Sequence, residues 1–262
     1  MALQSSGAIS LNDIHIEAGG SSGANASLND SDIRALIGKS SGAESSFSEF
    51  YGASGAAEFV GALTDTDTND FDDLSFAPGF MSPSVAAGDL IVIACSSQYT
   101  MTNTPTVYGF SNGYTNLGQI SGNPGNWLVY GFRSASDGNY ISFDGSPSGY
   151  AISAVMAVFR GVTSLKNSNY IFRSSGMPNP STLSGVSGTK LFVLSGHLDD
   201  DGVTMTAPSG YTMAGATYFS SGSYRSSTGI AYKISTNTGN ESVGAFGGGG
   251  NDQNAAYLMR FG

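Results

Sequence analysis

His197 is the residue in this chain that comes closest to a catalytic arrangement. Asp199, Asp200 and Asp201 follow it within four positions, and serines are abundant along the whole sequence. Serine, histidine and aspartate are the residue types of a hydrolytic triad, which is assembled in space rather than in sequence. However, no Gly-x-Ser-x-Gly elbow joins a predicted strand to a predicted helix. Asp201 followed by Gly202 is typical of a hairpin turn. We therefore predict that the protein is not an enzyme.

Neither the carboxylates nor the potential metal ligands form a recognisable site in the sequence. The acidic residues gather in turn-like stretches, at Asp65–Asp73 and Asp199–Asp201, whereas a glycosidase needs two carboxylates across a cleft. The first stretch opens like a calcium loop but lacks the glycine and the glutamate that such a loop requires. We favour a solvated loop there over a calcium site. His15, His197 and Cys95 are too few soft ligands for zinc, so no metal and no cofactor is predicted.

The composition is that of an acidic protein with few charges. The 10 basic and 20 acidic residues give a net charge of −10, which repels phosphate backbones and argues against nucleic acid as a partner. The single cysteine, Cys95, excludes an internal disulfide. The N-terminus lacks the basic and apolar regions of a signal peptide, and no apolar run is long enough to span a bilayer. We expect a protein that is made in a cytoplasm and does not insert into a membrane.

A buried strand organises the predicted fold. Residues 88–97 form an apolar, largely β-branched run without alternating polar residues, which is typical of a strand covered on both faces. A similar run begins at Gly188, 100 positions further along. Each run is followed by a Gly-Tyr-Thr turn, an amphipathic strand, a Gly-Asn hairpin and a long apolar strand. The matched segments are 111–115 and 208–212, 128–132 and 230–234, 138–139 and 239–240, and 154–160 and 255–261.

These matches predict an internally duplicated β domain. The domain covers residues 56–262, with pseudo-repeats at 88–161 and 188–262. Each repeat carries about five strands, and a sheet of that size with one apolar face needs a partner face. We therefore predict an all-β fold, an antiparallel β-sandwich that is jelly-roll-like. The connection Asn167–Gly185 is predicted to be irregular apart from a short strand at Tyr170–Phe172. The C-terminus is expected to lie inside the fold.

Residues 1–55 have a different character and are predicted to form three short helices. Three serines are each followed, three positions later, by an acidic residue, as in a capping box. The predicted helices span roughly Leu11–Ala18, Asp30–Ile37 and Phe47–Tyr51. Helices this short need a surface to pack on, which the β domain could provide if they form a small cap. We favour a docking segment that packs on another subunit or protein, through Leu11, Ile14, Ile33, Leu36, Ile37, Phe47 and Phe50.

Three stretches of this segment carry a family resemblance, at Gly7–Ile14, Glu17–Gly20 and Ser46–Gly52. They resemble an N-terminal segment of tailed-bacteriophage virion proteins, which are mostly tail, tail-fibre or structural proteins. In those proteins the segment precedes different C-terminal domains, as an attachment module would. The resemblance implies a virion component and brings no catalytic residues with it. The β domain is similar to lectin-like sandwiches of phage and other microbial surface proteins.

The resemblance leads us to expect a tail-fibre or tail-tip component that docks to other virion proteins and presents its sandwich to the host surface. A capsid-decoration or head-spike protein is the alternative on the same particle, and a carbohydrate-binding module is a further hypothesis. We expect a homo-oligomer, with a trimer favoured by analogy with spikes and fibres. Its target would be a host-surface glycan or protein.

Recognition contacts are expected on exposed rings and at loop tips, because binding residues concentrate on loops held by a rigid scaffold. Several rings could stack on a sugar, although we favour strand packing for all but one or two of them: Tyr108, Tyr114, Trp127, Tyr211, Tyr218 and Tyr224. The glycine run 247–250 is either a flexible hairpin loop or an exposed recognition loop. The selected recognition candidates are Tyr114, Tyr211, Gly248 and Gly249.

Overall fold

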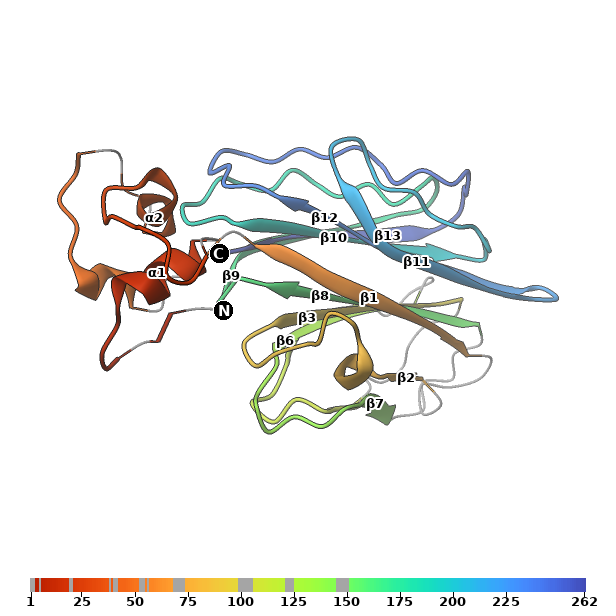
Figure 1. The fold of residues 1–262 in the computed structure, drawn as a ribbon. Coiled ribbons are helices and arrows are strands. Elements are labelled where there is room, and N and C mark those ends of the chain that lie inside the picture. The colour runs from red at the N-terminus through yellow and green to blue at the C-terminus, as the bar shows by residue number, and fades with distance from the viewer. Residues whose placement is uncertain are drawn as a thin grey trace.

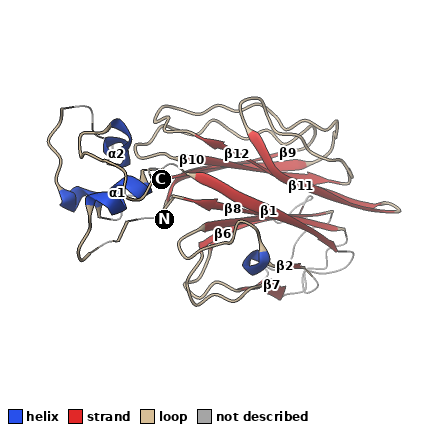
Figure 2. Cartoon of the chain, viewed as in Figure 1, coloured by secondary structure: helices blue, strands red, loops and turns tan. Residues whose placement is uncertain are grey.

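A computed structural model describes residues 3–4, 6–18, 21–37, 39, 42–51, 55, 57–67, 74–98, 106–120, 125–144 and 151–262. Within these residues, two five-stranded antiparallel sheets lie face to face, and a three-stranded sheet covers one of them (Figures 1 and 2). A small helical unit lies at one end. The predicted all-β sandwich preceded by short helices is therefore confirmed.

The first sheet has the strand order β1-β8-β3-β6-β5 and the second has the order β11-β12-β10-β13-β9. The strands of the first sheet are β1 Glu58–Asp67, β3 Leu90–Ser97, β5 Thr115–Ile120, β6 Gly125–Phe132 and β8 Ile152–Arg160. Those of the second are β9 Leu165–Arg173, β10 Leu191–Asp199, β11 Thr212–Ser221, β12 Tyr224–Ile234 and β13 Asn254–Phe261. In both sheets the strand that the sequence marks as buried, β3 or β10, is the central one.

The two sheets repeat one topology, as the sequence matches predicted. Read from the same edge, β1, β8, β3, β6 and β5 correspond to β9, β13, β10, β12 and β11. The outer hairpins even share an irregularity. The register shifts between Asn116 and Gly118 in the first sheet and between Met213 and Gly215 in the second. Each sheet takes four strands from one predicted repeat and its edge strand, β1 or β9, from the segment before that repeat. The duplication, rather than a jelly-roll alternation between sheets, therefore sets the topology.

Two details of the predicted repeat differ from the structure. The strand predicted at Tyr170–Phe172 is part of a longer edge strand, β9, which begins at Leu165 and includes the first residues of the connection that was predicted to be irregular. The last strands also match one residue away from the predicted alignment. Phe159 and Phe261 both pair with the first residue of their central strand, Leu90 and Leu191 respectively. Arg160 therefore corresponds to Gly262 rather than to Phe261.

An apolar core fills the space between the two sheets. Leu90 and Val92 of β3 point into it, as do the equivalent Leu191 and Val193 of β10. Aromatic rings from both sheets interlock there: the rings of Phe59 and Tyr232 stack with centroids 4.7 Å apart. Equivalent positions of the two repeats thus face each other across one core.

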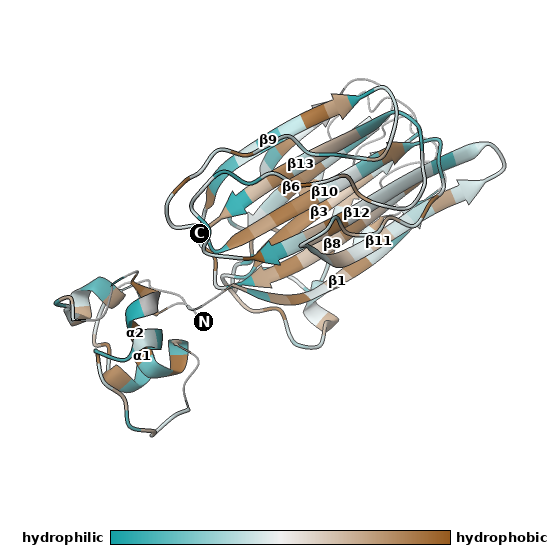
Figure 3. Ribbon diagram, turned by 90° about the horizontal axis from the view of Figure 1, so that it is seen from above, coloured by the Kyte–Doolittle hydropathy of each residue, from teal (hydrophilic) through white to brown (hydrophobic). Residues whose placement is uncertain are grey.

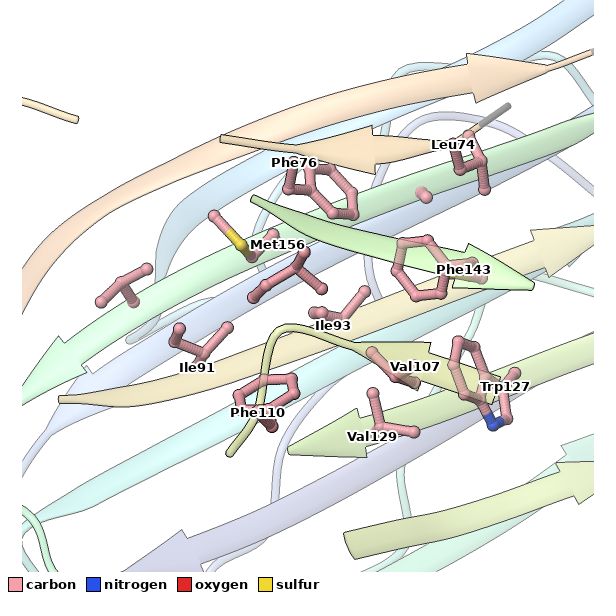
Figure 4. Close-up of a cluster of buried hydrophobic side chains, with 14 of the residues drawn as sticks. Leu74, Phe76, Ile91, Ile93, Val107, Phe110, Trp127, Val129, Phe143 and Met156 are labelled. Carbon is pink, nitrogen blue, oxygen red and sulfur yellow. The ribbon is translucent and has the colours of Figure 1, made fainter. Parts of the chain in front are cut away.

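The outer face of each sheet is covered as well. The first is covered by the sheet β2-β7-β4, formed by β2 Ser75–Phe76, β4 Thr106–Tyr108 and β7 Ile141–Asp144, with the 3-10 turn η2 Pro78–Phe80. Figure 4 shows Phe76, Val107 and Phe143 of this cover sheet turned toward the first sheet. The second is covered by loops that carry Leu183, Met205 and Phe246. Because both faces of β3 and β10 are buried, their sequences do not alternate.

The helical unit lies beyond the end of the sandwich where β1 begins and β13 ends, clear of both sheets (Figure 3). It contains α1 Leu11–Glu17, α2 Ser31–Leu36 and the 3-10 helix η1 Phe47–Phe50. We call this the proximal end of the sandwich. At the opposite, distal end the β11–β12 hairpin protrudes (Figure 1). The three predicted helices are therefore confirmed, with the last one a single 3-10 turn.

Truncating an inward-facing ring should destabilise the sandwich far more than truncating an outward-facing one. Phe159 is fully buried between the sheets, whereas Phe80 is 65% exposed. Phe159→Ala should lower the free energy of unfolding by about 3–5 kcal/mol, and the matched Phe80→Ala should change it by less than about 0.5 kcal/mol. Urea denaturation of both variants checks this. Similar losses in the two variants would contradict the layer assignment.

Candidate functional site

The helical unit has a small core of its own. Ile14 of α1, Ile33 of α2 and Phe50 of η1 are fully buried, and Leu3 is 8% exposed beside them. Partly buried side chains pack around them: Ile9, Leu11, Ala26, Leu28, Leu36 and Ile37. Short helices that are unstable alone gain stability by sharing one core, so the unit has the packing of a very small domain.

This core argues against an exposed docking surface for three of the seven predicted residues. Ile14, Ile33 and Phe50 are fully buried inside the unit, and Leu11, Leu36 and Ile37 are partly buried against them. Phe47 is the exception and is 41% exposed. Ile16 and Tyr51, which the sequence analysis did not select, are 45% and 37% exposed. Among the described residues of the unit, the large apolar side chains most available to a partner are therefore Ile16, Phe47 and Tyr51.

The predicted capping boxes hold the helix starts. Ser10 donates its backbone N–H to the Asp13 carboxylate at 2.9 Å, and the Asp13 N–H donates to the Ser10 hydroxyl at 3.1 Å. The Ser10 hydroxyl, which donates to the Asp13 carboxylate at 2.6 Å, and the Ser10 N–H lower the pKa of Asp13 below its usual value. The Ser46 N–H donates to Glu49 in the same way at 2.7 Å. Local sequence thus fixes where α1 and η1 begin.

Contacts around Gly55 join the helical unit to the sandwich. The Gly55 N–H donates to the Glu17 carboxylate at 2.9 Å, and the Lys190 ammonium donates to the Gly55 carbonyl oxygen at 3.3 Å. Burial lowers the pKa of Lys190, while the negative charge of Glu17 acts in the opposite direction. Glu17 belongs to α1 and Lys190 directly precedes β10, so this junction links the unit to the second sheet.

His197 lies in a sealed polar layer between the sheets. Its Nδ1 is 3.0 Å from the Cys95 carbonyl oxygen, which can only accept, so Nδ1 carries the hydrogen. Its Nε2 therefore accepts from the Ser195 hydroxyl at 3.0 Å. Burial lowers the pKa of His197 to about 3, which keeps the ring neutral. The layer continues through the hydroxyls of Ser96 and Thr228, which are 2.6 Å apart.

This geometry argues against a working triad. A serine and a histidine are hydrogen-bonded, but a backbone carbonyl occupies the position that the aspartate of a triad takes. Ser195 and His197 are both fully buried, so a substrate has no approach to the serine oxygen. The layer provides hydrogen bonds between the two sheets, which is a structural role.

Asp199 follows this layer at the distal end and is nearly buried, at 5% exposed. Its Oδ1 has no hydrogen-bond partner within the described residues. Burial, together with the negative charges of Asp252, Asp200 and Asp201, raises its pKa to about 7. The neighbouring carboxylates of Asp200 and Asp201 therefore raise the pKa of Asp199 and do not act as the aspartate of a triad with His197.

The two recognition tyrosines occupy equivalent positions in the repeats and are half-buried. Tyr114 precedes β5, packs beside Phe110 and accepts from the Val107 N–H at 3.4 Å. Tyr211 precedes β11 and donates to the Glu241 carboxylate at 2.9 Å. Burial and the Glu241 charge raise the pKa of Tyr211. These contacts favour packing over recognition for both rings.

The other sequence candidates are spread over the sandwich. Gly248 and Gly249 have positive φ values of 136° and 86°, and a side chain at Gly248 would meet the Thr204 carbonyl oxygen. These two glycines therefore shape a turn. Trp127 is fully buried. The acidic stretch is described only up to Asp67, and residues 68–73 lie outside the described part. Among the described residues, no group of three or more His, Cys, Asp or Glu side chains could hold a metal ion.

A cleft of about 700 Å³ lies at the proximal end beside Asp89 and Arg160. The guanidinium of Arg160 donates to both carboxylate oxygens of the buried Asp89, at 2.8 and 2.7 Å, and to the Ser84 carbonyl oxygen at 3.0 Å. The hydrogen bond to Asp89 raises the pKa of Arg160. Because the two charges neutralise each other, we assign this pair to fixing the 84–89 loop against β8.

The most exposed large apolar side chains gather on the cover sheet instead. Phe80, Tyr140 and Tyr108 are 65%, 58% and 51% exposed, and we call them the aromatic platform. Of these three rings, only Tyr108 was among those that the sequence suggested could stack on a sugar. The alternation Tyr140-Ile141-Ser142-Phe143 could have indicated an outward Tyr140, since Ile141 and Phe143 are buried. No local sequence pattern predicts that Phe80 is exposed, because its position depends on the contact between its neighbour Gly79 and the backbone of Asn139.

The buried Asp199 should give the protein a measurable pH dependence. Its folded pKa of about 7 lies above the usual 3.8. Between these pH values the folded state holds a proton that the unfolded state has released, so the protein loses stability as pH rises. Asp199→Asn removes this dependence. The stability of the variant relative to the parent should rise by about 1.4 kcal/mol per pH unit across that range. Urea denaturation at several pH values checks this.

The control for this experiment is His197→Gln. A folded His197 pKa of about 3 against the usual 6.5 means that stability is lost as pH falls below 6.5. This variant should therefore gain relative stability toward acid, the opposite sign from Asp199→Asn. A pH-independent difference for Asp199→Asn would contradict the burial of its carboxyl group.

Removing the Lys190 ammonium should loosen the helical unit from the sandwich. Lys190→Met deletes the hydrogen bond to Gly55 and the attraction to Glu17, while the cores of the two parts remain intact. Small-angle scattering should show a larger radius of gyration, and protease should cleave the chain faster near Gly55, where the helical unit joins the sandwich. Lys166→Met, at a neighbouring lysine, serves as the matched control. Equal behaviour of the two variants would contradict the role of Lys190.

Comparisons with known proteins leave the chain without an assigned relative. No family model, curated protein or solved structure matches it. In the described residues, no helix is long and apolar enough to cross a membrane.

Proposed function

We propose that this chain is a structural protein of a tailed-bacteriophage particle, a tail-fibre or tail-tip component that contacts the host surface. The proposal starts from the resemblance of stretches in residues 7–52 to virion proteins. The observation that carries it is the two-part build of the chain. The helical unit has its own core at the proximal end, while the sandwich has separate cores and carries its most exposed rings on the cover sheet.

In this proposal the helical unit docks and the sandwich is displayed. Ile16, Phe47 and Tyr51 are the apolar side chains available for docking. A partner that buries them would gain roughly 25 cal/mol for each Å² of apolar surface removed from water. The proposal includes no catalytic step, since the Ser195–His197 pair is sealed inside the sandwich. We expect virion proteins as partners and the virion as the location.

A capsid-decoration or head-spike protein would use the same two-part build, and the position on the particle distinguishes it from a tail component. A free carbohydrate-binding module is the alternative outside the particle. It is favoured by the aromatic platform alone and would leave the helical unit without a role. Closed symmetry is the rule for such assemblies, and we propose a homotrimer.

The solution mass of the full chain and of a version starting at residue 56 tests the assembly role of the helical unit. The full chain should be a trimer and the shortened one a monomer, because the shortened chain keeps the sandwich cores but loses Ile16, Phe47 and Tyr51. Light scattering measures both. Phe47→Ala should weaken the trimer, and Ile234→Ala, at an exposed position of β12, should not.

Two monomers would contradict assembly through the helical unit. Immunogold labelling of purified particles with antibodies against the sandwich would then decide between docking on a larger virion protein and a free binding module. Label on the tail supports the tail-fibre proposal, label on the head supports decoration, and unlabelled particles contradict both.

A further inference from the structure

We propose that the aromatic platform of Phe80, Tyr108 and Tyr140 binds an uncharged saccharide. This inference gives a ligand class to the host contact proposed above and rests on that proposal for its biological setting. The binding itself is a property of the folded chain and is argued from the geometry of the cover sheet.

The exposure of these rings is the first step of the argument. They are the three most exposed large apolar side chains of the described residues, and all three belong to one layer. The other exposed rings lie on the second sheet, at Tyr170 and Phe172 of β9, Tyr218 of β11 and Tyr224 of β12, or in the helical unit. Single exposed rings need no explanation, but a cluster of them marks a binding surface.

The rings are close neighbours. The centroids of Phe80 and Tyr140 are 5.5 Å apart, with the rings in an edge-to-face arrangement. Tyr108 pairs with Ser142 across β4 and β7, and Tyr140 is two residues before Ser142. Tyr140 directly precedes β7. Continuing the alternation of β7 by one residue puts Tyr140 on the face of Ser142, which makes it a diagonal neighbour of Tyr108 within reach of one ligand.

The backbone beneath the rings is held tightly. The Gly79 N–H donates to the Asn139 carbonyl oxygen at 3.1 Å, and a Cβ at Gly79 would lie 2.6 Å from the Asn139 Cα. Gly109 has a φ of 105°, and its Cβ would lie 2.5 Å from the Tyr140 carbonyl oxygen. Only glycine allows these approaches. Each ring therefore follows or precedes a close backbone contact, which preorganises the platform for binding.

The chemistry of the surface indicates the ligand. Tyr108 and Tyr140 combine a flat apolar ring with a hydroxyl group, and Ser75 and Ser142 lie side by side on the same sheet. A pyranose has the complementary surface, with C–H groups on its face and hydroxyls around its edge. The net charge of −10 disfavours an acidic sugar. The nearby Asp137 carboxylate is already used, since it accepts the N–H groups of Ser111 and Ser134.

The test uses the full chain and a defined panel of hexasaccharides made of glucose, galactose, mannose or N-acetylglucosamine, with oligogalacturonate as the acidic probe. Titration calorimetry should detect at least one neutral probe with a Kd of about 1 mM or tighter. Tyr140→Ala and Phe80→Ala should each weaken that binding about tenfold or more. Tyr218→Ala removes a ring of the other sheet that is 45% exposed and should leave the binding unchanged.

Because the platform rings are exposed, their loss should not unfold the chain, and thermal denaturation of each variant verifies this. The proposal is overturned if no neutral probe binds, if the acidic probe binds better, or if binding survives both platform variants. It is also overturned if Tyr140→Ala instead lowers the solution mass, since the platform would then be a contact between copies. None of these outcomes depends on docking through the helical unit, so failure of the particle proposal stays distinguishable.

Discussion

Burial of β3 and β10 on both faces is the constraint on which the rest of this structure depends. Every residue of these two strands is buried, which only a layer on each side can achieve. The sheets supply the inner layer for each other, and the cover sheet and the loops around Leu183, Met205 and Phe246 supply the outer layers. The sandwich is therefore four layers thick, and each outer layer is free to differ from the other.

The duplication fixes the inner layers and leaves the outer ones to diverge. Equivalent residues, such as Leu90 and Leu191, face one common core, so a change in one repeat must fit the other. The two outer layers do not face each other, so a change in one of them does not have to fit the other. In the first repeat the cover is a short sheet whose outer face carries the aromatic platform. In the second it is a set of loops joined by isolated bridges, as between Leu183 and Glu241. Specialisation for binding is expected in the layer with the fewest packing demands.

What could be predicted from the sequence follows the same division. The unbroken apolar runs and matched turns predicted the central strands and the duplication, because two-sided burial leaves a local signal. Only the segment Tyr170–Phe172 of β9 was predicted, since an edge strand with exposed polar residues carries a weak apolar signal. The apolar periodicity of the docking residues indicated that Ile14 and Ile33 are buried, but it could not show that they are buried within the helical unit itself. Phe80 had no signal, since its place depends on the contact between Gly79 and Asn139.

The location of the polar groups also separates binding from catalysis in this fold. The two serine hydroxyls in contact with the His197 ring, those of Ser195 and Ser96, lie between the sheets, where burial keeps the ring neutral. Its hydrogen bonds cross from β10 to β3, because the ring nitrogen reaches the Cys95 carbonyl oxygen. Satisfied polar groups at such a position set how two sheets align. In the interior, Ser195 and His197 therefore serve to align the two sheets. The most exposed large apolar groups of the described residues are the rings of the aromatic platform, and these are the groups that we propose for binding.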